Sequence, residues 1–391
     1  MSIGRLNVGS PRRPAGQTES YLDWNATAPL RSEAVAAISE VLARGGNPSS
    51  VHRRGRSARQ VVERAREAIA ELVGGVDPSG VVFVSGGTEA NHLALLGAGR
   101  ERVLVSAVEH DSVRHAIPSA ETIRVDLDGI VDLAALDRLL AADPRPALVS
   151  VMFANNETGV LQPVEEISGL ACKYGALFHC DAVQAAGKVR LEAHAIGADL
   201  ITISAHKLGG PPGIGALIVT GALELAPLIR GGGQERGRRA GTENLPGIAG
   251  FAAAARVAAT EIAIYDGVRA LRDELEGSIA ATVPEALVLG QGVSRLPNTS
   301  ALSMPGVPAE TQVIALDLEG VMVSAGAACS SGKVGPSHVL AAMGVTPAIA
   351  SSTIRVSLGW DSSEADIAHF LQAWGALYWR CRRFATGVRA A

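Results

Sequence analysis

The chain has 391 residues, of which 47% are hydrophobic and 19% charged, and its formal net charge is −4 at pH 7. The length predicts two or three domains, and the small negative charge gives no reason to expect nucleic acid or an anionic membrane as a partner. No apolar run approaches the ~20 residues that a membrane span requires, so the composition favours a large globular α/β protein.

Residues 1–20 contain arginines among several glycines and prolines, which break any amphipathic helix. We expect an N-terminal arm here, associated with a smaller domain. The four cysteines are widely spaced and form neither a CxxC pair nor a zinc-type spacing. Free thiols and a reducing compartment follow, and we expect a cytoplasmic protein with no metal site.

Residues 21–255 alternate short apolar runs with helical patterns, and we expect them to form a large domain. Apolar residues at helical spacing between residues 56 and 72 predict a helix that Gly74 ends. Strand-like runs follow, and most are apolar throughout, as in a parallel sheet covered by helices on both faces. These runs are "VVFV", "RVLVSA", "ALVSVMF", "ALFHC", "DLITIS" and "GALIVT".

Residues 256–391 predict a smaller α+β domain. A long Ala-rich helix over residues 247–281 is expected to bridge into it. The later strand candidates are shorter: "ALVLG", "NTSALSMPG", "VMVSAG" and "STIRVSLG".

Ligands of doubly wound sheets lie beyond the carboxyl ends of the strands, so the residues that follow each strand are candidates for a site. Gly87 and Thr88 could hold an anion at a helix start, although Thr88 serves equally well as an ordinary N-cap. His110 could stack on a ring or act as an acid or base, or it could be a hydrogen-bonded structural residue. Asp181 ends an apolar run, and its carboxylate needs a partner such as a protonated ring nitrogen, an arginine or a helix N-terminus.

The stretch "SAHKLGGPPGIG" places Lys207 after a strand and before rigid loop residues. Together with the groups above, Ser204 and His206 complete an anion cradle. Pyridoxal phosphate requires a set of groups of this kind: donors for its phosphate, a side chain that stacks on its ring, an acid for its ring nitrogen and a lysine. The neighbours His179, Cys180 and Asp181 cannot share a metal, because adjacent strand residues point to opposite faces.

The chain resembles the cysteine desulfurases of the iron–sulfur cluster assembly and nitrogen fixation type, which are fold-type I pyridoxal phosphate enzymes of the class V aminotransferase family. The resemblance runs from about Tyr21 to Asp361. It rests on "YLDWNATAPL", "GNPSSVHRRGR", "SGGTEAN", "NNETGVLQPV", "HCDAVQAAGK", "SAHKLGGPPGIGAL", "GGGQERGRRAGTENLPGIAGF", "SAGAACSSGKVGPSHVLAAMG" and "STIRVSLG", in this order.

The resemblance implies a large domain with a mainly parallel seven-stranded sheet flanked by helices, a smaller α+β domain, and a homodimer with shared active sites. It implies catalytic roles for Cys329, Lys207 and His110, with Lys207 as the lysine that bonds the cofactor. Asn156 and Arg355 match binders of the substrate carboxylate, although Asn156 alone reads as a turn residue and Arg355 could be a structural ion pair. The matching cofactor-binding positions are Gly87, Thr88, His110, Asn156, Asp181, Gln184, Ser204, His206, Lys207 and Thr242.

Cys329 lies among small residues, and taken alone it could be a buried, inert cysteine. The resemblance implies instead that its thiolate takes sulfur from L-cysteine, releases L-alanine and passes the sulfur to an acceptor protein such as a cluster scaffold. Selenocysteine lyase, another class V aminotransferase and a non-catalytic persulfide carrier are the alternatives. Trp24, Ala205 and Ala240 depart from the commonest family motifs and could alter turnover.

Overall fold

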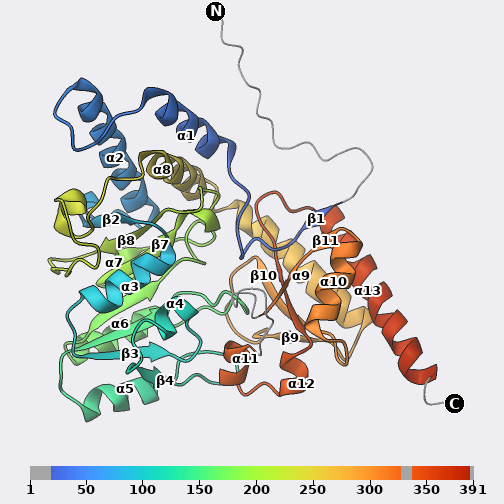
Figure 1. Cartoon of the computed structure of the whole chain (residues 1–391). Helices are drawn as coiled ribbons and strands as arrows, with labels where there is room; N and C mark the ends of the chain where they lie inside the picture. Colours follow the sequence, from blue (N-terminus) through green and yellow to red (C-terminus); the bar gives the residue numbers. More distant parts are fainter. Residues whose placement is uncertain (1–18, 327–336, 388–391) are drawn as a thin grey trace, which may run out of the picture.

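The computed structural model describes residues 19–326 and 337–387. A seven-stranded sheet lies at the centre of the larger part of the molecule, at the left of Figure 1. Its strands run parallel except β8, which is antiparallel to both of its neighbours. Across the sheet, the order is β2 (Val81–Val84), β8 (Gly215–Val219), β7 (Leu200–Ser204), β6 (Leu177–Asp181), β5 (Ala147–Met152), β3 (Arg102–Ser106) and β4 (Glu121–Ile123).

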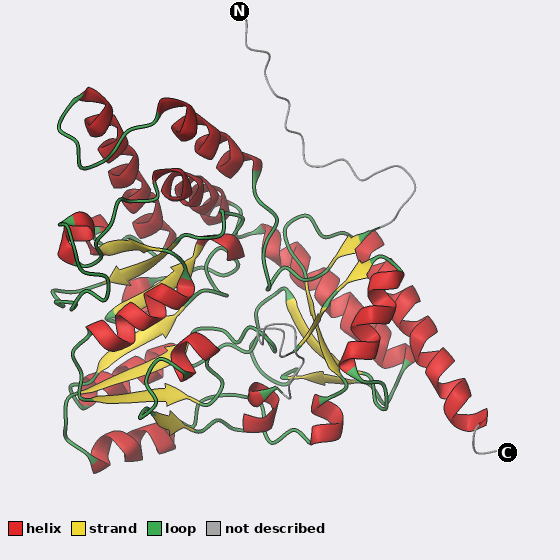
Figure 2. Cartoon of the chain, viewed as in Figure 1, coloured by secondary structure: helices red, strands yellow, loops and turns green. Residues whose placement is uncertain are grey.

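Helices cover both faces of this sheet, which explains why its strands are apolar throughout (Figure 2). On β2, Val81 and Phe83 pack into one core with α2, whereas Val82 and Val84 pack into another with α3. The helices of this part are α1 (Ser32–Arg44), α2 (Arg53–Leu72), α3 (Gly87–Gly97), α4 (Asp111–Arg114), α5 (Leu133–Ala142), α6 (Val164–Lys173), α7 (Ala193–Ile196) and α8 (Leu245–Thr260).

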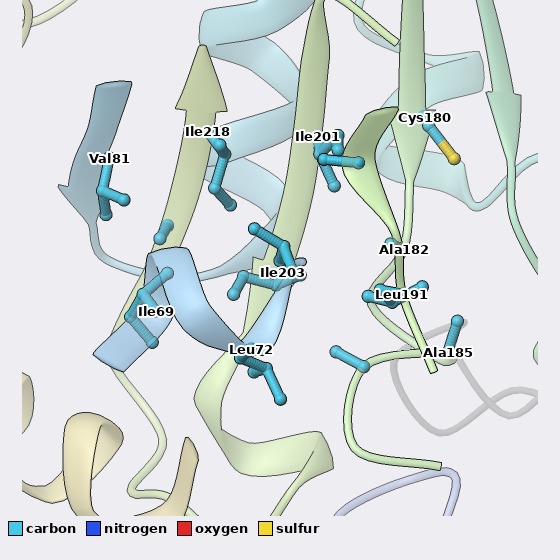
Figure 3. Packing of buried hydrophobic residues seen from close by; sticks show 14 of the residues in the cluster. Ile69, Leu72, Val81, Cys180, Ala182, Ala185, Leu191, Ile201, Ile203 and Ile218 are labelled. Carbon is cyan, nitrogen blue, oxygen red and sulfur yellow. The ribbon is translucent and has the colours of Figure 1, made fainter. Parts of the chain in front are cut away.

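Figure 3 shows the first of these cores from close by: Ile69 and Leu72 at the end of α2 lie against isoleucines of β7 and β8. Short 3-10 turns complete this part: η1 (Pro78–Gly80), η2 (Ala205–Lys207) and η3 (Gln234–Gly237). The turn η2 follows β7 directly and fixes where Lys207 leaves the sheet.

A second core forms the smaller part of the molecule, at the right of Figure 1. It contains stacked aromatic rings of α13, where the ring centroids of Phe370 and Trp374 lie 6.3 Å apart. Its elements are β1 (Ser20–Tyr21), α9 (Ile264–Thr282), β9 (Leu287–Leu289), β10 (Thr299–Ser303), α10 (Ala309–Leu318), β11 (Val321–Met322), β12 (Ser324–Ala325), α11 (His338–Ala342), α12 (Pro347–Ala350), β13 (Thr353–Ser357) and α13 (Glu364–Gly387).

The mixed α/β architecture agrees with the predicted fold class. The start of the described chain belongs to the second core, because β1 pairs with β11 and Leu22 is buried there. Most of the predicted N-terminal arm, residues 1–18, lies outside the described residues. The domain boundary expected near residue 255 stays a prediction.

The long bridging helix predicted over residues 247–281 is wrong, because two helices, α8 and α9, stand there with a bend of 75° between them. The break lies where the two cores meet. Ala258 of α8 is buried in the first core and Tyr265 of α9 in the second, while Glu261 between them pairs with Arg31 at 2.6 Å. Tertiary contacts thus override a sequence of high helix propensity.

Within the part of the chain that the structure describes, no single helix is long and apolar enough to cross a membrane. The bent pair α8 and α9 meets that criterion when the two helices are taken together.

Candidate active site

A cavity of about 370 Å³ opens where several strands of the large sheet end. It brings together ten of the twelve predicted site residues, although they come from positions 87 to 355 of the chain. These are Gly87, Thr88, His110, Asn156, Asp181, Gln184, Ser204, His206, Lys207 and Arg355.

The cavity has one wall suited to an anion. Gly87 and Thr88 form the first turn of α3, where backbone N–H groups have no partner within the helix. The alternative of Thr88 as an N-cap is wrong, because the helix begins at Gly87 and its N-cap is Gly86. Space at Gly87 is limited, since a Cβ there would lie 3.1 Å from a methyl group of Val183. Ser204 lies beside Gly87, at the end of β7, where its Cβ would be 3.6 Å from the same added atom.

His206 follows on the same side. Burial lowers its pKa from 6.5 to about 4, and the nearby Lys207 and Lys188 act in the same direction. His206 is therefore neutral at pH 7. One ring nitrogen can then donate a hydrogen bond and the other can accept one.

A hydrogen-bonded chain joins Asp181 to His110. The Asn91 amide donates to Asp181 Oδ2 at 2.8 Å and to Ser112 Oγ at 2.9 Å. The backbone N–H of Ser112 donates to His110 Nδ1 at 3.1 Å. A neutral His110 therefore carries its proton on Nε2. Val183 N–H donates to Asp181 Oδ1, so the carboxylate is held by two neutral donors while its residue lines the cavity.

Asn25 connects the lysine to the loop after β6. Its backbone oxygen accepts from Lys207 Nζ at 2.7 Å and from Gln184 Nε2 at 3.0 Å. Lys207 also donates to the Ala26 carbonyl at 2.8 Å. These bonds to neutral carbonyl groups hold the Lys207 amine at the cavity wall.

Arg355 lies on β13 and reaches the cavity from the smaller part of the molecule. Its guanidinium donates to Asp23 Oδ1 at 2.7 Å and to the Asn156 carbonyl at 3.1 Å. Among the described residues, its Nε is buried without a hydrogen-bond partner. A guanidinium held in this way can receive a carboxylate from a ligand.

Two buried carboxyl groups stand behind the cavity wall. Burial raises the pKa of Glu109 to about 8, and that of Glu157 to about 7. Glu109 accepts from Ser106 Oγ and Met152 N–H, and Glu157 accepts from Ser337 Oγ at 2.6 Å. Glu109 is thus mainly protonated at pH 7, while Glu157 is close to half protonated.

Thr242 lies apart from this cavity and lines a separate pocket beside Glu235 and Arg239. Cys329 lies outside the described residues. His179 uses both ring nitrogens in bonds to the hydroxyl groups of Ser150 and Thr202, so it is a core histidine.

The three departures from the family motifs are buried. Trp24 packs edge-on against Trp360, with ring centroids 4.6 Å apart, and donates to the Tyr21 carbonyl. Ala205 and Ala240 are 0% and 4% exposed. None of the three lines the cavity.

No role was predicted from the sequence for Asn25, Asn91 and Lys188, which hold the side chains of the site. Each lies inside a motif that was quoted: "YLDWNATAPL", "SGGTEAN" and "HCDAVQAAGK". The sequence signal for such a role is a polar residue among apolar neighbours, because a polar group that is buried requires hydrogen-bond partners.

Comparison with known proteins decides the family. The family model described as aminotransferase class-V matches residues 20–370. The chain belongs to the aminotransferase class-V family.

Its relatives in this family are similar over nearly their whole length. The chain is 44% identical to a cysteine desulfurase of Cereibacter sphaeroides, with 90% of this chain and 94% of the relative covered. A NifS-like protein of Rickettsia africae, solved by X-ray crystallography, superposes with a TM-score of 0.86 at 37% identity over 92% of this chain and 99% of its own. A protein named SspA, solved in complex with cysteine, has a TM-score of 0.75 at 28% identity over 87% of this chain and 98% of its own.

Proposed function

We propose that this protein is a pyridoxal phosphate-dependent cysteine desulfurase, which converts L-cysteine to L-alanine and holds the released sulfur as a persulfide on Cys329. The observation that carries the proposal is the convergence of Lys207, Asp181 and Arg355 on one cavity. Relatives named cysteine desulfurase support it, as does a structural neighbour solved with cysteine.

The residues present fit the cofactor. The cavity supplies backbone N–H groups at the α3 start and the Ser204 hydroxyl for a phosphate, and a carboxylate for a ring nitrogen. Among the described residues, Asn91 Oδ1 is buried without a partner beside that carboxylate. When bound, pyridoxal phosphate supplies an aldehyde that joins to amines and a protonated ring that withdraws electrons from the substrate.

The chain's own residues then have separate tasks. Thr88, Ser204 and His206 would bind the phosphate, His110 would cover the ring, and Asp181 would hold the proton on the ring nitrogen. The Gln184 amide would donate to the ring's phenolic oxygen. Lys207 would supply the amine for the covalent link and would move protons at the substrate carbons.

Arg355 and Asn156 hold the substrate carboxylate. The Cys329 thiolate attacks the substrate sulfur: an S–S bond forms, the C–S bond breaks, and its electron pair goes to the carbon skeleton. Protons delivered by Lys207 complete alanine, and the sulfur remains on Cys329.

We further propose a homodimer, since Thr242 lines a pocket separate from that of Lys207 and could serve the cofactor site of a second copy. A protein acceptor such as a cluster scaffold would take the sulfur in the cytoplasm.

The test uses the protein reconstituted with pyridoxal phosphate and supplied with L-cysteine. We expect a yellow absorbance, equal yields of alanine and sulfide under reducing conditions, and added sulfur on Cys329 by mass spectrometry. Lys207→Ala should remove the yellow absorbance, while Cys329→Ala should keep it and stop sulfide release.

Cys172→Ala is the matched control, because Cys172 is an exposed free thiol and should be dispensable. A colourless protein with added pyridoxal phosphate would favour the carrier alternative. Unchanged sulfide release by Cys329→Ala would refute the desulfurase. Selenide released from selenocysteine with no sulfide released from cysteine would favour the lyase.

A further inference from the structure

A second lysine is buried next to the cavity. Lys188 is 2% exposed and lies in the loop between β6 and α7. Its Nζ donates to Gln184 Oε1 at 2.8 Å and to Asn25 Oδ1 at 2.7 Å. Both acceptors are neutral amide oxygens, so a cation at this position would have no carboxylate in these bonds.

A neutral Lys188 amine has two N–H groups, one for each of its two acceptors. An ammonium has three, so one N–H group would be left without either acceptor. Burial lowers the pKa of Lys188 well below its ordinary value, and the positive charges of Lys207 and Arg355 act in the same direction. The neutral form also avoids a second positive charge near the Lys207 amine.

The hydrogen bond from Lys188 fixes the orientation of the Gln184 side-chain amide. Lys188 donates to the oxygen end, and the backbone oxygen of Asn25, which can only accept, faces the nitrogen end at 3.0 Å. A flipped amide would place two oxygens together on one side. The NH2 group of Gln184 has a second hydrogen, and Gln184 lines the cavity.

Lys188 holds the other partner in place as well. Asn25 Oδ1 accepts from Lys188 and from the Asn298 amide at 3.1 Å, so the Asn25 amide cannot flip either. Its nitrogen then donates to Thr299 Oγ1 at 2.9 Å. Asn25 keeps its bonds to Asn298 and Thr299 without Lys188, so the orientation of the Gln184 amide depends more on Lys188 than that of Asn25 does.

We propose that Lys188 is a positioning residue of the cofactor site: it orients the Gln184 amide so that an N–H group points to a ring oxygen of the cofactor. The inference rests on the proposed function, in which Gln184 contacts pyridoxal phosphate. Lys188 acts through Gln184 and contacts no reacting atom.

The experiment is a double-mutant cycle on the holoenzyme, with the dissociation constant of pyridoxal phosphate measured by equilibrium dialysis as the readout. Lys188→Met removes the donor at nearly constant length, and Gln184→Leu removes the amide. We expect each variant to weaken cofactor binding roughly two- to tenfold, the range for one hydrogen bond. The double variant should be no weaker than Gln184→Leu alone, because Lys188 acts through that amide.

Lys173→Met is the matched control, since the Lys173 side chain is 57% exposed and pairs with Asp137, away from the cavity. It should leave the dissociation constant unchanged. If Lys188→Met does not accumulate as folded protein, Lys188→Ala replaces it in the cycle.

Fold-changes that multiply in the double variant would overturn the inference, as would unchanged cofactor binding by the Lys188 variant. Failure of the wild-type protein to bind pyridoxal phosphate is a different result, because it would refute the proposed function itself.

Discussion

Glu157→Gln is expected to change how the stability of the protein depends on pH. Glu157 is 5% exposed and accepts a hydrogen bond from Ser337, which lies at the start of α11. Burial is the main reason why its pKa rises from 4.5 to about 7, and the charge of Asp111 acts in the same direction. The Ser337 hydrogen bond and the charges of Arg355 and His110 lower the pKa and offset part of this rise. The substitution keeps an oxygen for Ser337 and removes the titration.

The magnitude follows from the two pKa values. Below pH 4.5 the carboxyl is protonated in both the folded and the unfolded chain, so it adds no pH dependence. Between pH 4.5 and 7 the unfolded chain releases the proton and the folded protein retains it, so stability falls as pH rises. At 1.36 kcal/mol for each pKa unit, the loss that is complete above pH 7 is on the order of 3 kcal/mol.

Urea unfolding of wild type and Glu157→Gln at pH 5 and pH 8 measures this term. The free energy of unfolding of Glu157→Gln, relative to wild type, should increase by about 2.5 kcal/mol from pH 5 to pH 8, because part of the loss has already occurred at pH 5. Glu165→Gln, at an exposed carboxyl in the first turn of α6, is the control and should show no such change. A difference between wild type and Glu157→Gln that stays constant from pH 5 to pH 8 would refute a raised pKa at this site.

Three further substitutions test packing, ion pairing and substrate binding. Gly359→Ala should destabilise the protein by about 1–3 kcal/mol in thermal unfolding, because a Cβ there would lie 2.0 Å from ring atoms of Trp24; an unchanged melting temperature would contradict this packing. Glu235→Gln should cost about 3–5 kcal/mol in urea unfolding, because it leaves the buried Arg66, now paired at 2.7 Å, without its carboxylate, and a loss below 1 kcal/mol would count against the pair. Arg355→Lys should raise the KM for L-cysteine about tenfold with a smaller change in kcat, since lysine lacks the planar fork; steady-state kinetics with an unchanged KM would remove Arg355 from the substrate site.

The strands of the large sheet were predictable because burial on both faces leaves an apolar run in the sequence. Five quoted runs correspond to whole strands, for example "DLITIS" to β7. The edge strand β4 (Glu121–Ile123) was missed, since it has three residues and its middle one is exposed. A strand of this kind is defined by its pairing with β3, which no local pattern shows.

The break between α8 and α9 could not be read from local sequence, because the residues on both sides favour a helix. At the break, Glu261 pairs with Arg31, which is 230 positions away in the chain. Contacts at such separations are set by the assembled cores and leave no periodic signal.

The site was predicted in its cavity-lining residues and missed in the residues that support them. Asp181 ends a strand and Lys207 and His110 follow strands. The carboxyl ends of parallel strands meet at one edge, so the convergence of these residues could be anticipated. Asn25 comes from another segment and Lys188 from the same loop as Gln184, and the role of both depends on the orientation of amide groups. Neither spacing nor composition carries that information.

In the proposed function, Lys207 carries the cofactor in the cavity at the strand ends. Reduction of the reconstituted protein with sodium borohydride, followed by peptide mapping with mass spectrometry, tests it most directly. We expect a phosphopyridoxyl group on Lys207. A label on Lys188 or another lysine, or no label at all, would contradict it.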